Sequence, residues 1–360
     1  MPQADVSVVV PFYNVRDDVK RCVDSLIAQT FNASRYELVL VDDGSTDGTG
    51  ALLDVYAANV TSKPAITVLH QENQGLSAAR NYGVRMSTGT YVTFVDGDDC
   101  VSEQYLERLW QGLESLPSGT QRPLVISLYD YRDKHGVNTV GGLSDYSAGR
   151  SPHNSAPTRN SAHTQPAHAI MGTTEAMNAV LYGEIPLSAW GKLAPRIEYV
   201  EHPFPEGRLY EDLSSIARLV HDSESVAVVD EPLYHYVIHD GSIVHSATID
   251  ERQTHDFALA IGEFTSQSMR FFRDDPQFDV SAFTYQQSLH CARLFTALDD
   301  AVSKERCRTI VRFVRKRLPG FIGNRRIPLR ERLRLGLLCA CPALYRKLFR
   351  LFIKFTRGVG

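Results

Sequence analysis

Four apolar runs, each followed by a polar cluster and then by an amphipathic stretch, constrain the fold of this chain more than any other feature. The runs are residues 6–10, 36–41, 66–69 and 91–95. Strands that are buried on both faces are apolar throughout, and strands that alternate with helices form parallel sheets. The pattern therefore predicts an α/β domain with a mostly parallel sheet and helices on both faces.

The polar clusters that follow these runs are expected to meet. They are Pro11–Asn14, Asp42–Asp47, Asn73–Arg80 and Asp96–Asp99. In an open parallel sheet the loops at the carboxyl ends of the strands gather at one edge, where ligands bind. We expect one site at that edge, built from segments far apart in the sequence.

The last of these clusters favours a cation. Asp96, Asp98 and Asp99 follow a run suited to a buried strand, and burying carboxylates is costly unless a cation or a ligand compensates their charge. Their oxygens suit Mg²⁺ or Mn²⁺, whose other coordination positions would be open to phosphate oxygens. The alternative is an acidic surface turn, but the convergence of the four clusters favours a site.

The two ends of the chain differ in charge. Residues 301–360 contain 17 of the 38 Lys and Arg residues but only two of the 42 Asp and Glu residues. The acidic body disfavours nucleic-acid binding, and the basic, leucine-rich tail over 321–360 favours a helix lying on an anionic membrane surface. Its longest uncharged run, 335–345, is too short for a bilayer, which needs about 20 residues. The alternative is a basic helix packed on the protein, and Pro342 is expected to kink the helix in either case.

Other features of the sequence bear on where the protein works and on how its domains are organised. No signal-peptide pattern precedes the first apolar run, and the six cysteines form no Cys-x-x-Cys pair, so we expect a cytoplasmic protein with reduced cysteines. Residues 132–168 are rich in Gly, Ser, His and Pro and are expected to form a mobile insert rather than a metal site. Residues 246–320 have helical spacing of apolar residues.

Some motifs are excluded or ambiguous. Residues 43–54 come near a calcium-loop pattern, but a strand rather than a helix leads into them and the terminal Glu is missing. No Gly-x-x-x-x-Gly-Lys-Ser/Thr and no Gly-x-Gly-x-x-Gly occurs, which disfavours kinase and hydride-transfer chemistry. Glu211 and Asp212 open an amphipathic stretch, where acids commonly do no more than complement the helix dipole.

Six motifs within residues 5–245 jointly resemble glycosyltransferase family 2, the inverting nucleotide-sugar transferases of GT-A fold that build bacterial surface polysaccharides. They are Val-Val-Val-Pro-Phe-Tyr-Asn at 8–14, Val-Asp-Asp-Gly-Ser-Thr-Asp at 41–47, Asn73-x-Gly75-x-Ser77-x-x-Arg80-Asn81, Phe-Val-Asp-Gly-Asp-Asp at 94–99, Trp190-x-Lys192-Leu193 and Glu211-Asp212. The resemblance implies a Rossmann-like GT-A domain over 1–245, before the helical region 246–320 and the tail 321–360.

The resemblance also implies which residues contact the nucleotide-sugar. They are Pro11, Tyr13, Asp42, Asp43, Asn73, Arg80, Asp96, Gly97 and Lys192. Pro11 and Tyr13 would flank the base and the ribose, Asp42 or Asp43 would accept a hydrogen bond from uracil, and Arg80 would help to hold the nucleotide. Asp96 would face the ribose.

The remaining roles concern the metal and the reaction. By the resemblance, Asp98 binds the Mn²⁺ or Mg²⁺ that bridges the pyrophosphate, and His239 contacts the metal or a phosphate, with His245 as its alternative. Asp212 would take the proton of the acceptor hydroxyl as that oxygen attacks the anomeric carbon. Trp190 and Lys192 would shape the pocket, unless Trp190 only fills the core.

The resemblance therefore predicts a metal-dependent inverting glycosyltransferase for surface-polysaccharide synthesis. It would move a sugar from a nucleotide-sugar, expected to be a UDP-sugar, to a hydroxyl of a glycan or a lipid-linked acceptor at the inner face of the cell membrane. The alternative is a noncatalytic nucleotide-sugar-binding or scaffolding subunit of a polysaccharide assembly complex, which would keep the fold without needing Asp212.

Overall fold

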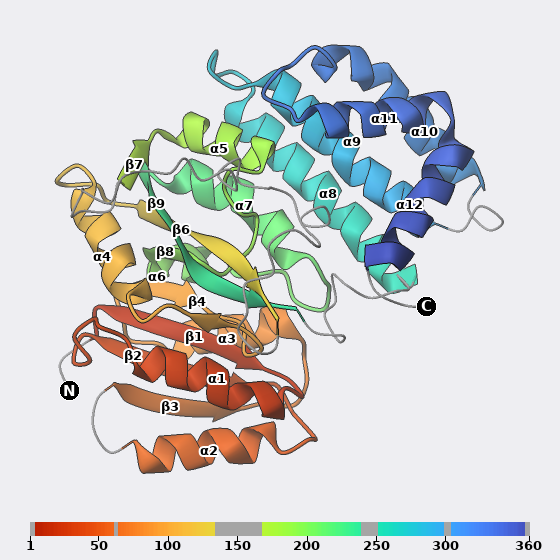
Figure 1. The fold of residues 1–360 in the computed structure, drawn as a ribbon. Coiled ribbons are helices and arrows are strands. Elements are labelled where there is room, and N and C mark those ends of the chain that lie inside the picture. The colour runs from red at the N-terminus through yellow and green to blue at the C-terminus, as the bar shows by residue number, and fades with distance from the viewer. Residues whose placement is uncertain (1–3, 61–63, 134–167, 239–250, 299–303, 357–360) are drawn as a thin grey trace, which may run out of the picture. The chain divides into compact units, whose positions relative to one another are not determined.

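The computed structural model describes residues 4–60, 64–133, 168–238, 251–298 and 304–356 (Figure 1). These residues form two compact units. The first is built from residues 4–60, 64–133, 168–173 and 187–238, and the second from residues 174–186, 251–298 and 304–356. Nearly all of the expected insert 132–168 lies outside the described residues.

A nine-stranded sheet forms the centre of the first unit, in the order β3-β2-β1-β4-β8-β6-β9-β5 with β7 paired to β9. Strands β1 to β4 run parallel, whereas β8 is antiparallel to both of its neighbours. The strands are β1 Val6–Phe12, β2 Tyr36–Asp42, β3 Ala65–His70, β4 Tyr91–Phe94, β5 Cys100–Val101, β6 Pro123–Arg132, β7 His168–Met171, β8 Lys192–Pro195 and β9 Ser225–Val237. The α/β architecture predicted from the apolar runs is confirmed.

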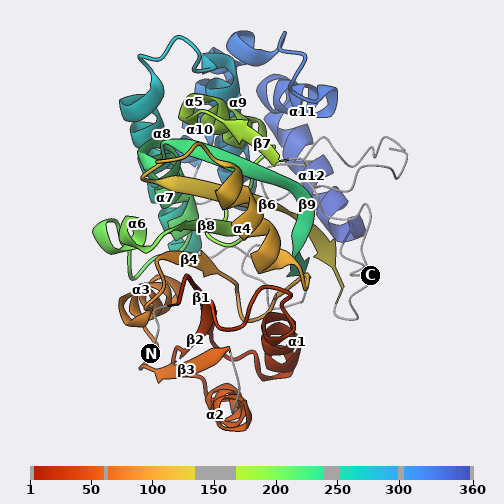
Figure 2. The same cartoon turned by 90° about the vertical axis from the view of Figure 1, so that its left-hand side faces the viewer.

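Helices cover both faces of this sheet, and Figure 2 shows α1 and α3 on opposite faces of β1 and β2. They are α1 Arg16–Ile27, α2 Thr49–Asn59, α3 Leu76–Met86, α4 Tyr105–Ser115, α6 Arg196–Glu201 and α7 Glu211–Asp222. Helix α1 buries Val19, Cys22, Val23 and Leu26, which recur at helical spacing. These side chains join the β1 and β2 residues Val8 and Leu38 in one core.

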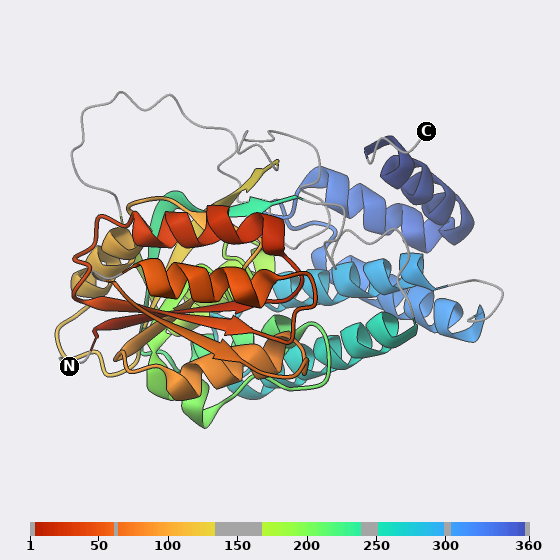
Figure 3. The same cartoon turned by 90° about the horizontal axis from the view of Figure 1, so that it is seen from below.

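The second unit is helical and has a core of its own. Its helices are α5 Thr173–Tyr182, α8 Glu251–Phe272, α9 Val280–Ala297, α10 Lys304–Phe321, α11 Leu329–Ala340 and α12 Pro342–Thr356, the last five drawn in cyan to blue in Figures 1 and 3. Leu335, Leu338, Tyr345 and Phe349 of α11 and α12 join the core formed with α9 and α10. Over residues 321–349 the tail is therefore packed against this unit along one side.

Pro342 interrupts the tail, as predicted. Helix α11 ends at Ala340 and α12 begins at Pro342, where a missing N–H costs nothing because the first N–H groups of a helix have no partner within it. Among the described helices, none is long and apolar enough to cross a membrane.

Candidate active site

The predicted convergence of loops is confirmed for the ends of β1 and β2. The register places Phe12 opposite Asp42, so the two strands end at one level. Beyond them, the Asn14 N–H donates to Ser45 Oγ at 3.0 Å, and Asn14 Oδ1 accepts from the Thr46 N–H at 2.8 Å. Asn14 adopts a positive φ of 52° to make this turn, a conformation that Asn tolerates better than most residues.

Asp43 ties the loop after β3 to the loop after β2. Its Oδ1 accepts from Gln71 Nε2 at 2.7 Å and from the Gln74 N–H at 2.9 Å, and its Oδ2 accepts from the Gly75 N–H at 2.8 Å. Asp43 is buried, whereas Asn73 of the same loop is exposed. The carboxylate therefore organises the backbone that leads into α3.

Asp42 lies beside this arrangement and is also buried. Its Oδ1 accepts from the Ser45 N–H at 3.1 Å, and its Oδ2 lies 3.1 Å from His70 Nδ1. Hydrogen bonding to Asp42, and then to Asp54, raises the pKa of His70. Tyr13, by contrast, is 50% exposed at the rim of these loops, so its ring is accessible to a flat ligand.

The acidic turn divides its carboxylates between the protein interior and its surface. Asp99 is buried and accepts from Tyr234 Oη at 2.5 Å and from the Val237 N–H at 2.8 Å, which anchors the turn to β9. Burial, reinforced by Asp98 and Asp96, raises the pKa of Asp99. Asp98 remains partly exposed. The structure thus assigns Asp99 a supporting position and leaves Asp98 as the outer carboxylate.

Gly97 lets this turn approach β1. Its N–H donates to Pro11 O at 3.2 Å. A Cβ on residue 97 would lie 2.4 Å from Phe12 Cδ1 and 2.8 Å from Pro11 O, both far closer than such atoms pack. A side chain at this position would push the acidic turn away from the end of β1.

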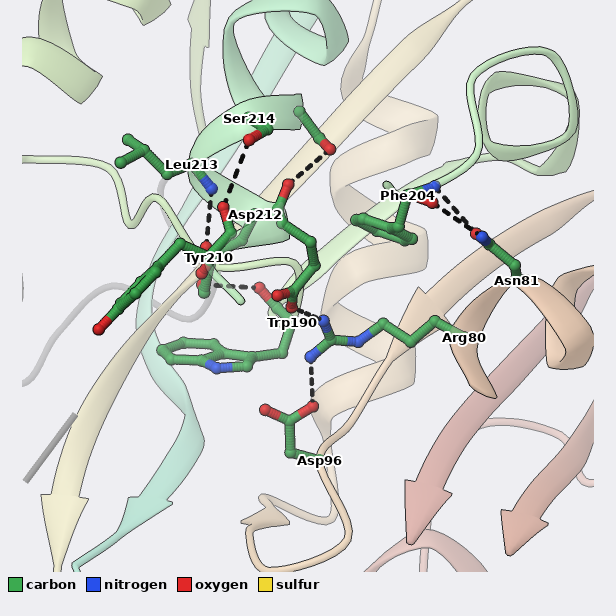
Figure 4. A network of polar contacts seen from close by, with 12 residues as sticks. Arg80, Asn81, Asp96, Trp190, Phe204, Tyr210, Asp212, Leu213 and Ser214 are labelled. Carbon is green, nitrogen blue, oxygen red and sulfur yellow. Dashed lines mark hydrogen bonds and ion pairs between the residues drawn. The ribbon is translucent and has the colours of Figure 1, made fainter. Parts of the chain in front are cut away.

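Arg80 joins the acidic turn to the start of α7 (Figure 4). Its side chain is 2% exposed; Nη2 donates to Asp96 Oδ1 at 2.6 Å, and Nη1 pairs with Glu211 Oε1. Burial disfavours the guanidinium charge, but the carboxylates of Asp96 and Glu211 outweigh this effect and raise the pKa of Arg80. Buried pairs of this kind are costly to break, at about 3–5 kcal/mol when one partner is removed.

Asp212 and Lys192 form the other charged part of the site. Lys192 is fully buried in β8 and its Nζ donates to Ser188 O at 2.5 Å. Burial lowers the pKa of Lys192 to about 7, against the attraction of Asp212. Burial and then the like charge of Glu211 raise the pKa of Asp212, while Arg80 and Lys192 oppose the rise. An aspartate with a raised pKa is suited to accept a proton near neutral pH.

The donor atoms for a divalent cation are few. Within the described ranges, no three His, Cys, Asp or Glu side chains come together around one point. The expected ligand His239 and its alternative His245 lie outside the described residues. The partly exposed Asp98 fits a hard cation whose other ligands come from a bound diphosphate or from solvent, since Mg²⁺ is commonly held by one or two carboxylates plus substrate phosphates.

Several contacts of the site were not anticipated from the sequence. Asn81 Nδ2 donates to Phe204 O at 2.9 Å, and Asn81 Oδ1 accepts from the Phe204 N–H at 2.9 Å. These two hydrogen bonds attach α3 to the chain before α7. Trp190 stacks on Tyr234 with ring centroids 4.0 Å apart, which places Trp190 largely in the core. Tyr210 has a positive φ of 64°. No sequence pattern signals this conformation, because few residues other than Gly adopt it.

Comparison with known proteins identifies the family. The model of the family described as "Glycosyl transferase family 2" matches residues 7–171. Glycosyltransferase GlyA of Streptococcus pneumoniae serotype 4 is 31% identical over 258 residues, which make up 72% of this chain and 34% of GlyA. This chain spans about a third of the length of the first curated relatives that it matches.

Solved structures agree on the fold. TarS 1–349 of S. aureus, in complex with UDP-GlcNAc, has a TM-score of 0.64 at 17% identity, over 98% of this chain and 92% of that chain. The mannosyltransferase PcManGT of Pyrobaculum calidifontis, in complex with GDP-Man and Mn²⁺, has a TM-score of 0.53 at 15% identity, over 99% and 86%. The chain belongs to glycosyltransferase family 2 and has the GT-A fold.

Proposed function

We propose that this protein is a metal-dependent inverting glycosyltransferase that moves a sugar from a UDP-sugar to a hydroxyl of a glycan or lipid-linked acceptor in surface-polysaccharide synthesis. One observation carries the proposal: the Asp96–Arg80–Glu211 chain of ion pairs ties the acidic turn to the residue before Asp212. Asp96, proposed to face the donor, and Asp212, proposed to accept the proton, are thus linked through one charged network. Residues 1–245 form the catalytic domain in this proposal.

Asp212 acts as the general base. Its raised pKa matches the requirement that a base ionised at neutral pH must still accept a proton readily. As Asp212 removes the proton of the acceptor hydroxyl, that oxygen attacks the anomeric carbon, and the bond to the nucleoside diphosphate breaks. The bond forms on the side opposite the leaving group, so the configuration inverts in one displacement.

The donor is held by the loops at the ends of β1 to β4. Pro11 and the exposed Tyr13 flank the base and ribose, Asp42 or Asp43 accepts from the base, and Asp96 faces the ribose. Asp98, with His239, would hold a Mn²⁺ or Mg²⁺ that stabilises the negative charge of the departing diphosphate. A UDP donor is supported by the likeness to TarS with UDP-GlcNAc, whereas PcManGT holds GDP-Man.

A donor screen tests this proposal. Hydrolysis and transfer are measured with a panel of UDP- and GDP-sugars, with Mn²⁺ and with EDTA, on the wild type, on Asp98→Ala and on a control, Asp274→Ala, whose side chain is 89% exposed. We expect turnover of a UDP-sugar that EDTA and Asp98→Ala both abolish and that the control retains. If the wild type binds UDP but turns over no sugar on a suitable acceptor panel, the noncatalytic alternative is favoured.

The tail is proposed to bring the enzyme to an anionic membrane. Leu329, Leu333, Leu344 and Leu348 of α11 and α12 are 44–64% exposed. In the described stretch 322–349 the exposed charged side chains are Arg325, Arg326, Arg330 and Lys347, and the one acid, Glu331, is buried. Arg326 pairs with Glu184, and Arg330 lies 3.9 Å from Glu331 Oε1, so the stretch keeps an excess of cations over acids. Exposed leucines beside such an excess suit the headgroup region of anionic lipids.

Point substitutions test this membrane proposal better than a truncation, because residues 327–349 contribute to the core of the helical unit. Leu344→Glu with Leu348→Glu should abolish co-sedimentation of the full chain with phosphatidylserine vesicles. Val55→Glu, at a 52% exposed position of α2, serves as the control. Binding by the double variant equal to that of the wild type would refute membrane docking through this tail.

A further inference from the structure

The segment 204–211, which leads into α7, is held at both ends by two adjacent residues of α3. Near its start, Asn81 makes hydrogen bonds of 2.9 Å with the backbone N–H and C=O of Phe204 and with Glu206 Oε1. At its end, Arg80 pairs with Glu211. Figure 4 shows both contacts extending from the same turn of α3. The Arg80-Asn81 pair therefore fixes the path of the chain that carries Asp212.

Arg80 is enclosed by protein. Its guanidinium carbon lies 5.9 Å from the centroid of the Phe94 ring and 5.6 Å from that of the Phe204 ring. Both of its terminal nitrogens are paired with carboxylates, and the side chain is only 2% exposed. A side chain in this position has little surface with which to contact a substrate, although the family resemblance implies a nucleotide-holding role for it.

The backbone beside Glu211 needs such a restraint. Tyr210 adopts the left-handed conformation, with φ 64° and ψ 36°, at the residue that caps α7. A non-glycine residue in this region costs about 1–3 kcal/mol and persists only where the surroundings enforce it. The Arg80–Glu211 pair joins the next residue to α3 and opposes relaxation of this turn.

We propose that Arg80 is a positioning residue: by holding Glu211 against Asp96, it fixes the first turn of α7 and keeps the Asp212 carboxylate at the donor site. This inference rests on the proposed function, in which Asp212 is the base. Arg80 does not touch the donor in this account. It acts on the reaction through the placement and the charge environment of Asp212.

The positioning role of Arg80 predicts a change in the pH dependence of the rate, because the charge of Arg80 acts on the pKa of Asp212. The charged groups that act on Asp212 are Glu211 on its own helix, Arg80 on α3 and Lys192 on β8. Glu211 raises the pKa of Asp212, and the two cations lower it. Loss of the Arg80 charge should therefore raise the pKa of the base and move the acid limb of the rate profile to higher pH, whereas Arg80→Lys keeps the charge and changes only the geometry.

Three variants of the full chain test the inference: Arg80→Lys, Arg80→Gln and Glu211→Gln, with Arg85→Lys as the control at an exposed position of the same helix. The readouts are UDP affinity by calorimetry, kcat and KM for the donor found in the screen, and the pH dependence of kcat. We expect kcat to fall by about 100-fold in Arg80→Lys, the scale for a misplaced reacting group, while the Kd for UDP changes by less than about threefold. Arg80→Gln should also move the acid limb upward.

Two outcomes would decide against the inference, and one would decide against the proposed function. A parallel loss of UDP affinity and of kcat in Arg80→Lys would make Arg80 a nucleotide-binding residue. If the Arg80 variants do not fold, Glu211→Gln provides the test, because its amide keeps the shape of the side chain and removes the ion pair with Arg80. An unchanged kcat in Glu211→Gln would overturn the positioning role of Arg80. A wild type without turnover refutes the proposed function instead, so the two failures are distinguishable.

Discussion

At the scale of the residue, two charged groups of the site have pKa values shifted by burial: Lys192, which is fully buried, and Asp212, which is partly exposed. Lys192 has a pKa lowered to about 7 by burial, and Asp212 has a raised pKa that Lys192 helps to hold down. A base must be deprotonated to act, so the rate falls as the pH drops through its pKa. Removal of a neighbouring cation should raise the pKa of Asp212, so the rate should begin to fall at a higher pH.

Lys192→Met tests this coupling. The substitution removes the cation that lowers the pKa of Asp212, so the acid limb of the kcat/KM profile should move to higher pH. Lys20→Met, at a lysine whose side chain is 78% exposed on α1, should leave the profile where it is. An acid limb that does not move in Lys192→Met would show that the two groups do not interact during the reaction.

Gly97 makes a second prediction at this scale. Because a Cβ would meet Phe12 at 2.4 Å and Pro11 O at 2.8 Å, Gly97→Ala should lower the free energy of unfolding by about 1–3 kcal/mol, the usual cost of overpacking. Gly262→Ala is the matched control, because a Cβ at this position in α8 meets nothing within 4 Å and should stabilise the helix by up to about 1 kcal/mol. Urea unfolding measures both, and equal effects would contradict the close approach at Gly97.

At the scale of the element, α9 of the helical unit buries a histidine. His290 is 1% exposed, its ring lies edge-on to Phe257 and Phe264 in α8, and burial lowers the pKa of His290 to about 3. The unfolded chain gains a proton at this residue below pH 6.5, whereas the folded chain does so only near pH 3. Stability is therefore complete above pH 6.5 and declines as the pH falls below that value.

The expected decline is about 2 kcal/mol between pH 7 and pH 5 from this residue alone. His290→Leu should remove this part of the pH dependence of the urea midpoint. His255→Leu, at an exposed position of α8, should retain it. Identical pH dependence in the wild type and in His290→Leu would contradict a buried neutral imidazole.

The elements also show where sequence reasoning succeeds. The runs at 6–10, 36–41, 66–69 and 91–95 predicted β1 to β4, because strands buried on both faces need apolar side chains throughout. Strand β8 escaped prediction because it is four residues long and begins with the buried Lys192. Strand β9 continues through Pro232, at the point where its register against β6 shifts.

At the scale of the whole molecule, the sequence predicted the loops that meet but not the ties between them. Asp43, Arg80, Asp96 and Asp212 were recognisable from motifs, each just after a strand or in the first half of a helix. That Arg80 pairs with Asp96 and with Glu211, 131 positions away, depends on the packing of α3 against the chain before α7. No local sequence pattern encodes a contact between residues so far apart. The Arg80–Glu211 pair beside Asp212 was therefore visible only in the structure.

The central claim is that Asp212 takes the acceptor proton in a site that binds a UDP-sugar. Its most direct test is the rate of sugar transfer by Asp212→Asn beside that of the wild type, with the Kd for UDP measured on both. We predict a loss of about 10²–10⁴-fold in kcat with an unchanged Kd, because asparagine keeps the size of the side chain and cannot accept the proton. Transfer by Asp212→Asn at the wild-type rate would contradict the account.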